Sequence, residues 1–180
     1  MKLVDAVTWV PEDGALSVGD GLATLPRFTR TAAAVVDRLA APMRHPVVLA
    51  TSSEAPEPAI IHAALSKRYP EVPTWSFVRA DAETLAASLL QAQFLCARAG
   101  AAVWVLVDLK PAAELAAAAY VRSDTQGRQL QLLRTADPAD PSLPHLNSCA
   151  GVLTLLDDSS ADCVSIRVGR WAITVRSRSV

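Results

Sequence analysis

The sequence lacks the short motifs that identify common nucleotide-binding and hydrolytic sites. Neither G-x-x-x-x-G-K-[ST] nor G-x-G-x-x-G occurs, and there is no G-x-S-x-G. The first two motifs bind phosphates through backbone amides, and the third presents the nucleophile of an α/β-hydrolase. We therefore predict no cofactor and no hydrolase serine.

The sequence also has little excess charge and no long apolar run. Its 17 Lys and Arg residues nearly balance 18 Asp and Glu residues, for a net charge of -1. This balance gives no bulk attraction to nucleic acid or to an anionic membrane. No apolar stretch reaches the roughly 18 to 20 residues that span a bilayer, and the first residues include acidic side chains and a proline where a signal peptide is apolar. We expect a cytoplasmic protein with no membrane span and no nucleic-acid partner.

Cysteine and histidine are scarce, with three residues of each. The cysteines have no C-x-x-C spacing, so we interpret them as free buried thiols and not as metal ligands. Spacing places no Ser, Cys or acidic partner beside the histidines, so we interpret those as surface or packing residues and not as catalytic bases. The residues concerned are Cys96, Cys149, Cys163, His45, His62 and His145.

Apolar residues make up 51% of the 180 residues, which is enough for one domain with a substantial core. Residues 74–110 predict a strand, a long helix and a second strand. Residues 75–79 favour β structure, and residues 103–109 form the apolar run of a strand buried on both faces. Between them, Leu85, Leu89, Ala92, Cys96 and Ala99 share one helical face. Asp81 is expected to cap this helix and Gly100 to end it.

A helix of this length returns the chain parallel to its start, so the sequence predicts an α/β fold. We expect a mostly parallel central sheet with helices on both faces and antiparallel strands at the C-terminal end. Further strands are expected at residues 3–10, 46–51, 130–133, 151–156 and 164–175, the last two paired antiparallel through a turn at residues 157–160. Further helices are expected at residues 29–40, capped by Thr29 or Thr31, and at residues 58–68 and 111–120. Residues 136–147 are expected to form a loop.

Arginines gather near the C-terminus. In a strand running from residue 166 to residue 178, Arg170, Arg176 and Arg178 would share one face, apart from Arg167. Such a face can bind an acidic partner, or it can be a solvated sheet edge that charge protects from pairing. The sequence leaves both interpretations open.

Residues 80–93, ADAETLAASLLQAQ, followed by GAAVWVLVD, resemble the central unit of the N-terminal half of a β-ketoacyl synthase, in the thiolase-like superfamily. Two other segments are similar to strands of that half: residues 46–51, PVVLAT, and the run CAGVLTLLD that begins at Cys149. More narrowly, the sequence resembles the degenerate ketosynthase-like or chain-length-factor proteins. The resemblance implies that residues 1–180 form a single thiolase-like half domain.

In active members of that family, the turn before the central helix presents a nucleophilic Cys. The corresponding turn here, VRADAE at residues 78–83, has none, and the second half that supplies further catalytic groups is missing. The resemblance therefore implies a non-catalytic subunit or partner protein in a fatty-acid-like, polyketide or aryl-polyene pathway, with no independent enzyme activity. Its partner would be a ketosynthase or a second copy of the chain, and the resemblance also allows for an acyl carrier protein.

The family dimerises through the strand that opens the central unit, so the resemblance places a candidate interface at Thr74, Trp75, Ser76, Phe77, Val78 and Arg79. Proline at Ser76 is then expected to remove a ladder donor from the exposed edge. The alternative function is a small α/β enzyme or ligand-binding protein with its site at the carboxyl ends of the parallel strands. Its candidate pocket consists of Thr51, Ser52, Ser53, Asp81 and Asp108, with Arg79 beside them.

Overall fold

The computed structural model describes residues 1–10, 23–53, 55–110, 113–123, 127–134, 148–156 and 162–176. These residues form one mixed sheet of eight strands: β1 (Lys2–Trp9), β2 (Val47–Ala50), β3 (Trp75–Val78), β4 (Ala101–Lys110), β5 (Ala113–Arg122), β6 (Arg128–Arg134), β7 (Cys163–Val168) and β8 (Trp171–Arg176). The helices are α1 (Arg27–Val36), α2 (Pro58–Arg68), α3 (Thr84–Ala99) and α4 (Ser148–Leu156), with a one-turn 3₁₀ helix, η2 (Asp81–Glu83), directly before α3. Across the sheet the strand order is β3-β2-β4-β5-β1-β6-β8-β7.

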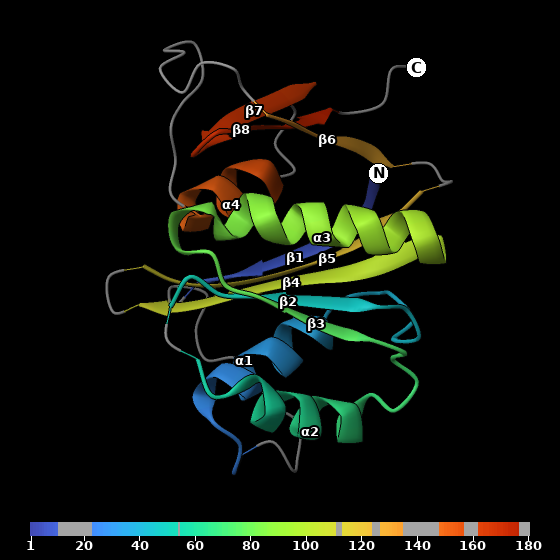
Figure 1. The fold of residues 1–180 in the computed structure, drawn as a ribbon, viewed down its shortest axis with the longest axis vertical. Helices are drawn as coiled ribbons and strands as arrows, with labels where there is room; N and C mark the ends of the chain where they lie inside the picture. The colour runs from blue at the N-terminus through green and yellow to red at the C-terminus, as the bar shows by residue number, and fades with distance from the viewer. Residues whose placement is uncertain are drawn as a thin grey trace.

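The sheet curls around α3 and α4. In Figure 1 these two helices lie between strands β6, β8 and β7 on one side and the other five strands on the other. One apolar cluster fills this interior and joins residues of α3 and α4 to both parts of the sheet, for example Leu89, Val152, Trp104 and Ile173. A second cluster packs α1 and α2 against the outer face of β2, β4 and β5. Helices therefore cover both faces of the five-strand part.

The central unit has the predicted order of strand, helix and strand. Strands β3 and β4 both run parallel to β2, which lies between them. Strand β4 is buried from Ala101 to Asp108, as its apolar run predicts. Four residues of the predicted helical face are buried, whereas the fifth, Ala99, is exposed at the helix end. Gly100 ends α3 in the left-handed conformation, with φ of 78°.

The fold class is confirmed, but parallel pairing is limited to β3, β2 and β4. The other five pairings between the described strands are antiparallel. The sheet is therefore mixed and not mostly parallel. The change of direction comes at β5, which pairs with β4 over ten residues in an antiparallel hairpin.

The prediction of a helix at residues 111–120 is wrong, because the described part of this segment is strand β5. Alanine has the highest intrinsic helix propensity, but tertiary packing overrides such preferences. In β5, Ala116 and Ala118 face the cluster that includes α1, whereas Ala117 and Ala119 face the cluster that includes α3. Small side chains on both faces let a helix layer approach this strand from each side.

The prediction of a strand at residues 151–156 is also wrong, because Ser148–Leu156 is helix α4. A short apolar run fits a buried helix as well as a buried strand. Gly151 lets this helix lie close to its neighbours, since a Cβ there would come within 2.9 Å of Ile166 Cδ1 and 3.0 Å of Leu85 Cδ2. The likeness of this segment to a ketosynthase strand therefore does not hold.

The strand expected at residues 164–175 is two strands, β7 and β8, joined by a turn in which Gly169 has φ of 57°. Arg170 lies in this turn, so the arginines expected on one face do not share a strand. Arg178, residues 136–147 and the turn at 157–160 lie outside the described residues. In α1, the expected caps Thr29 and Thr31 are buried inside the helix, and Pro26 holds the cap position.

Candidate functional site

A hydrogen-bonded cluster lies at the carboxyl ends of β2 and β4. Asp108, near the end of β4, is fully buried. Its Oδ1 accepts hydrogen bonds from the Ser52 backbone amide at 2.7 Å and from Thr51 Oγ1 at 3.2 Å. Its Oδ2 accepts one from Ser52 Oγ at 2.6 Å. One carboxylate thus holds the first turn of the loop that follows β2.

Ser53 completes this cluster. Its Oγ lies 2.9 Å from Thr51 Oγ1, and it accepts a hydrogen bond of 3.3 Å from the backbone amide of Leu109. Lys110 reaches the rim, where Nζ donates to Ser52 Oγ at 3.2 Å. The structure therefore brings together four residues of the predicted pocket, Thr51, Ser52, Ser53 and Asp108, and they bond to one another. Whether the cluster binds a ligand stays a prediction.

The fifth pocket residue, Asp81, lies at the tip of the turn between β3 and α3. It is exposed, and its φ of 44° is the one positive value among the described residues other than glycine. The N-cap position of α3 belongs to Glu83, so the prediction that Asp81 caps the helix is wrong. We call the segment Ala80–Glu83 the elbow.

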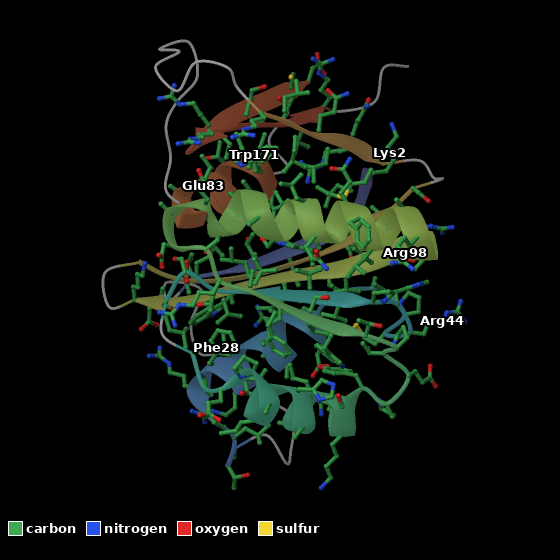
Figure 2. The ribbon with its side chains drawn as sticks, viewed as in Figure 1. Lys2, Phe28, Arg44, Glu83, Arg98 and Trp171 are labelled. Atoms are coloured by element: carbon green, nitrogen blue, oxygen red, sulfur yellow. The ribbon has the colours of Figure 1, made fainter. Side chains whose placement is uncertain are left out.

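Buried side chains tie the elbow to the Asp108 cluster. Thr84 Oγ1 accepts a hydrogen bond from the Ala80 amide at 2.9 Å and lies 3.4 Å from the Thr51 carbonyl, to which it donates. The β7–β8 turn packs closely against the elbow from the other side. A Cβ at Gly169 would lie 2.7 Å from Glu83 Oε1. Figure 2 shows Glu83 and Trp171 at this end of the molecule. The elbow thus has a fixed shape but carries no thiol.

The described cysteines are far from the elbow in the fold. Cys96 is buried in α3, three turns beyond the elbow, and Cys163 is exposed on β7. No group of three His, Cys, Asp or Glu side chains that could hold a metal ion occurs within the described ranges.

Of the histidines, His62 is exposed on α2, whereas His45 Nε2 lies 3.2 Å from the hydroxyl of Tyr120. Burial, and then the charges of Arg44 and Arg122, lower the pKa of His45. Neither histidine lies in the Asp108 cluster or in the elbow. His145 lies outside the described residues.

Strand β3 forms one edge of the sheet, and its hydrogen bonds to β2 show in which direction each backbone group of β3 points. The Val47 amide donates to the Thr74 carbonyl at 2.9 Å, and the Thr51 amide donates to the Val78 carbonyl at 3.1 Å. Because backbone groups alternate along a strand, Ser76 also points its amide and carbonyl toward β2. The amides and carbonyls of Trp75 and Phe77 therefore point outward. Proline at Ser76 would break the inner ladder and not the exposed edge, contrary to expectation.

Tyr69, just after α2, supports the edge strand. Its hydroxyl donates to Asp37 Oδ1 at 2.6 Å, and its ring lies 6.2 Å from the ring of Trp75. Burial and the hydrogen bond to Asp37 raise the pKa of Tyr69, so the phenol stays a donor. Arg68 pairs with the same carboxylate. Trp75 is thus held from the α2 side of the sheet.

On the other face of the sheet, α3 runs beside β3. Gln91 Nε2 donates to Ser76 Oγ at 3.4 Å, which places this flank of α3 next to the edge. Phe94 and Arg98 lie one and two turns further along the same flank. Phe94 is 53% exposed, and the guanidinium of Arg98 lies 5.4 Å from its ring centre. Sequence reasoning missed Phe94, although a large aromatic residue off the buried stripe was a visible signal.

No helix in the described part of the chain is both long enough and apolar enough to cross a membrane. No protein-family model matches the sequence, and no curated protein matches it. Among solved structures, one chain of the complex between the ketosynthase ApeO and its chain length factor ApeC, from Xenorhabdus doucetiae, is similar with a TM-score of 0.65 and 12% identity. That match covers 98% of this chain and 99% of the other.

A β-ketoacyl-[acyl carrier protein] synthase III (FabH) from Thermus thermophilus is similar with a TM-score of 0.52 and 15% identity. The match covers 95% of this chain but 64% of that one, so the protein spans about two thirds of the synthase. At these identities the likeness establishes the fold. The protein has a ketosynthase-like fold of the thiolase type, as the sequence resemblance implied.

Proposed function

We propose that the protein is a non-catalytic, ketosynthase-like subunit of a pathway that builds acyl chains, such as fatty-acid-like, polyketide or aryl-polyene synthesis. The observation that carries this proposal is the match to a chain of a ketosynthase and chain length factor complex over nearly the whole of both chains. We include in the proposal that residues 1–180 act as a single domain in the cytoplasm. The two apolar clusters support one domain, because both use the strands β2, β4 and β5.

The elbow supports the absence of acyl transfer. Covalent catalysis by a condensing enzyme needs a reactive thiolate, which is the nucleophilic form of Cys. Asp81 stands at the tip of the elbow, where a carboxylate cannot carry a thioester. The nearest described thiol in sequence, Cys96, is 1% exposed inside the core. Its burial puts this thiol out of reach of an acyl-thioester.

We further propose that a ketosynthase-fold chain is the partner and that it binds along Thr74, Trp75, Ser76, Phe77, Val78 and Arg79. The position of β3 at the edge of the sheet supports this surface. An acyl carrier protein would then deliver its acyl group to the assembly and not to this chain alone.

Intact-mass measurement after incubation with acyl-thioesters tests the catalytic part of the proposal. The wild-type protein should gain no acyl mass, whereas Asp81→Cys, which places a thiol at the tip of the elbow, should be acylated. An adduct on any cysteine of the wild-type chain would contradict a non-catalytic role. Light scattering of the protein, alone and mixed with a ketosynthase from the same genome, tests the partner; a monomer in both samples would contradict it.

The alternative, a ligand-binding site at the carboxyl ends of the parallel strands, has less support. A binding pocket needs polar groups that a ligand can satisfy. Here Thr51 and Ser53 are each 7% exposed, and Asp108 is fully buried. Their polar atoms already bond within the cluster, so the geometry is that of a structural clamp on the loop after β2.

A further inference from the structure

The three strands β6, β8 and β7 have one face toward α3 and α4 and one face away from them (Figure 1). Leu130, Ile173 and Ile166 belong to the interior cluster. Because side chains alternate along a strand, odd-numbered residues of β6 and β7 and even-numbered residues of β8 point outward. No helix in the described ranges lies on that side. We call it the outer face, and it consists of Gln129, Gln131, Leu133, Cys163, Ser165, Arg167, Ala172, Thr174 and Arg176.

Charge of one sign gathers on these three strands. Residues 128–134 and 163–176 contain five arginines and no aspartate or glutamate, although the whole chain has a net charge of -1. Arg134 and Arg176 are exposed, and Arg167 lies on the outer face with them. The whole-chain charge balance, from which we expected no attraction to an anionic surface, therefore does not describe this part of the molecule.

Leu133 projects from the same face. At 64% exposure it is the most exposed of the large apolar side chains that the structure describes. It lies on β6 opposite Ala172 of β8, which in turn lies opposite Arg167 of β7. Two strand spacings put Arg167 about 10 Å from Leu133, and Arg134 is the next residue in the chain. One exposed leucine thus stands at the edge of a basic, nearly flat surface.

We propose that the outer face binds the surface of an anionic phospholipid membrane, with arginines on the lipid phosphates and Leu133 inserted among the headgroups. This inference does not depend on the proposed function. It concerns the end of the sheet opposite β3, since β7 and β3 are its two edges. Peripheral contact of this kind needs no membrane-spanning helix.

The side chains of the outer face suit lipid headgroups. Arginine binds phosphate oxygens through two parallel hydrogen bonds, and each basic residue close to an anionic leaflet strengthens binding roughly fivefold. Between Arg176 and Arg167 the face carries hydroxyls, with Ser165 Oγ 2.9 Å from Thr174 Oγ1. Hydroxyls both donate and accept hydrogen bonds, so they suit phosphate and glycerol oxygens alike. The face therefore offers charge, polar groups and one apolar side chain together.

Leu133 also favours lipid over the other anionic partners. An acidic protein would complement the arginines, but it would need a pocket that matches the position of the leucine. A bilayer accepts an apolar side chain at any point of its surface. Single-stranded nucleic acid is held largely by aromatic stacking, and the outer face has no aromatic residue.

Sedimentation of the full-length protein with lipid vesicles tests the proposal. The protein should bind vesicles that contain about a third phosphatidylglycerol, bind pure phosphatidylcholine far less, and release partly at about 0.5 M salt, which screens charge. Arg134→Gln with Arg176→Gln should lower the affinity about 25-fold, as two factors of roughly five. The matched control is Arg38→Gln with Lys67→Gln, which removes two exposed charges on the α1 and α2 side of the sheet. It should change the affinity by less than about twofold, because those charges lie more than a Debye length from the membrane.

Leu133→Ser should lower the affinity about tenfold, and the loss should persist at high salt because it is apolar in origin. Circular dichroism confirms that each variant is folded. No binding of the wild-type protein to the anionic vesicles would overturn the proposal. An equal loss in the two double variants would overturn the outer face as the site, and full binding by Leu133→Ser would overturn the insertion of the leucine. Binding of an acyl carrier protein through Arg134 and Arg176, without vesicle binding, would show that the occupant is an acidic protein and overturn the lipid assignment.

Discussion

The Asp108 cluster and the β3 edge both belong to the three parallel strands, yet their polar groups are in opposite states. In the cluster, hydroxyls, amides and one carboxylate bond to one another within buried surroundings. At the edge, the backbone groups of Trp75 and Phe77 point away from the sheet. Unpaired groups, and not polar residues as such, mark where a protein has interactions left to make. The comparison therefore favours assembly at the edge over ligand binding at the cluster.

Replacing Asp108 by Ala should have the largest effect on this comparison. The change leaves three donors without their acceptor: the Ser52 amide, Ser52 Oγ and Thr51 Oγ1. At about 1–3 kcal/mol for each buried donor left unsatisfied, and with some rehydration at the rim, we expect a loss of about 3–5 kcal/mol. Urea unfolding followed by circular dichroism measures this loss.

Asp108→Asn is the matched control for that substitution. The amide keeps one acceptor oxygen for the Ser52 amide, so the loss should be clearly smaller than for alanine. A loss below about 1 kcal/mol for Asp108→Ala would mean that the cluster is not a clamp. The ligand-binding alternative would then gain support.

Proline substitutions at two positions of β3 distinguish the backbone groups that bond to β2 from those that point outward. Ser76→Pro removes an amide that bonds to β2 and leaves a carbonyl of β2 unsatisfied, so it should cost about 2–3 kcal/mol of stability. Phe77→Pro removes an outward amide, which edge positions tolerate, so beyond the loss of the ring it should weaken assembly and not folding. Phe77→Ala controls for the lost ring. Urea unfolding and light scattering of the three variants give the two readouts, and equal destabilisation by both prolines would refute the backbone directions inferred here.

The sequence correctly predicted the helices and strands for which local pattern and tertiary packing agree. The β4 run, the stripe of Leu85, Leu89, Ala92 and Cys96, and the α2 bounds are local signals that the structure confirms. The errors lie where packing decides. The alanines of β5 prefer helix but lie between two helix layers, and α4 is too short for its period to be distinguished from that of a strand.

The residues of the Asp108 cluster could be predicted from the sequence about as well as the fold, whereas their hydrogen bonds could not. Strand ends in a parallel sheet place Thr51, Ser52, Ser53 and Asp108 at one edge, and the sequence located them correctly. It could not show that they satisfy one another, because hydrogen-bond partners depend on coordinates. The outward direction of Trp75 and Phe77 was equally hidden, since parity relative to β2 is fixed by the pairing and not by composition.

Ser52→Ala should have a smaller effect than the changes at Asp108 and Ser76. It removes one hydroxyl that donates to Asp108 Oδ2 and accepts from Lys110 Nζ, but it keeps the backbone bond to Oδ1. Because a hydrogen bond to a charged group contributes about 1.5–3 kcal/mol and Ser52 is only part-buried, we expect a loss near the lower end, about 1.5 kcal/mol. If Ser52→Ala also weakens the proposed assembly along β3 in light scattering, the Asp108 cluster and the β3 edge are coupled, and the distinction between them fails.

The smallest effect is expected at Asp81, whose φ is positive. Substitutions at this position test whether the elbow keeps its strained backbone shape although it carries no nucleophile. Glycine adopts this conformation freely, whereas alanine carries a Cβ that disfavours it by about 1–2 kcal/mol. Both substitutions remove the same carboxylate from the N-terminal end of α3, so their difference isolates the backbone. We expect Asp81→Gly to be more stable than Asp81→Ala by about 1 kcal/mol in urea unfolding, after allowance for the greater freedom of glycine in the unfolded chain. Equal stability would mean that the turn relaxes when Asp81 is replaced. The elbow would then be a feature of this one side chain, whereas a clear preference for glycine would show that Thr84 and the β7–β8 turn hold the elbow in place whatever residue stands at its tip.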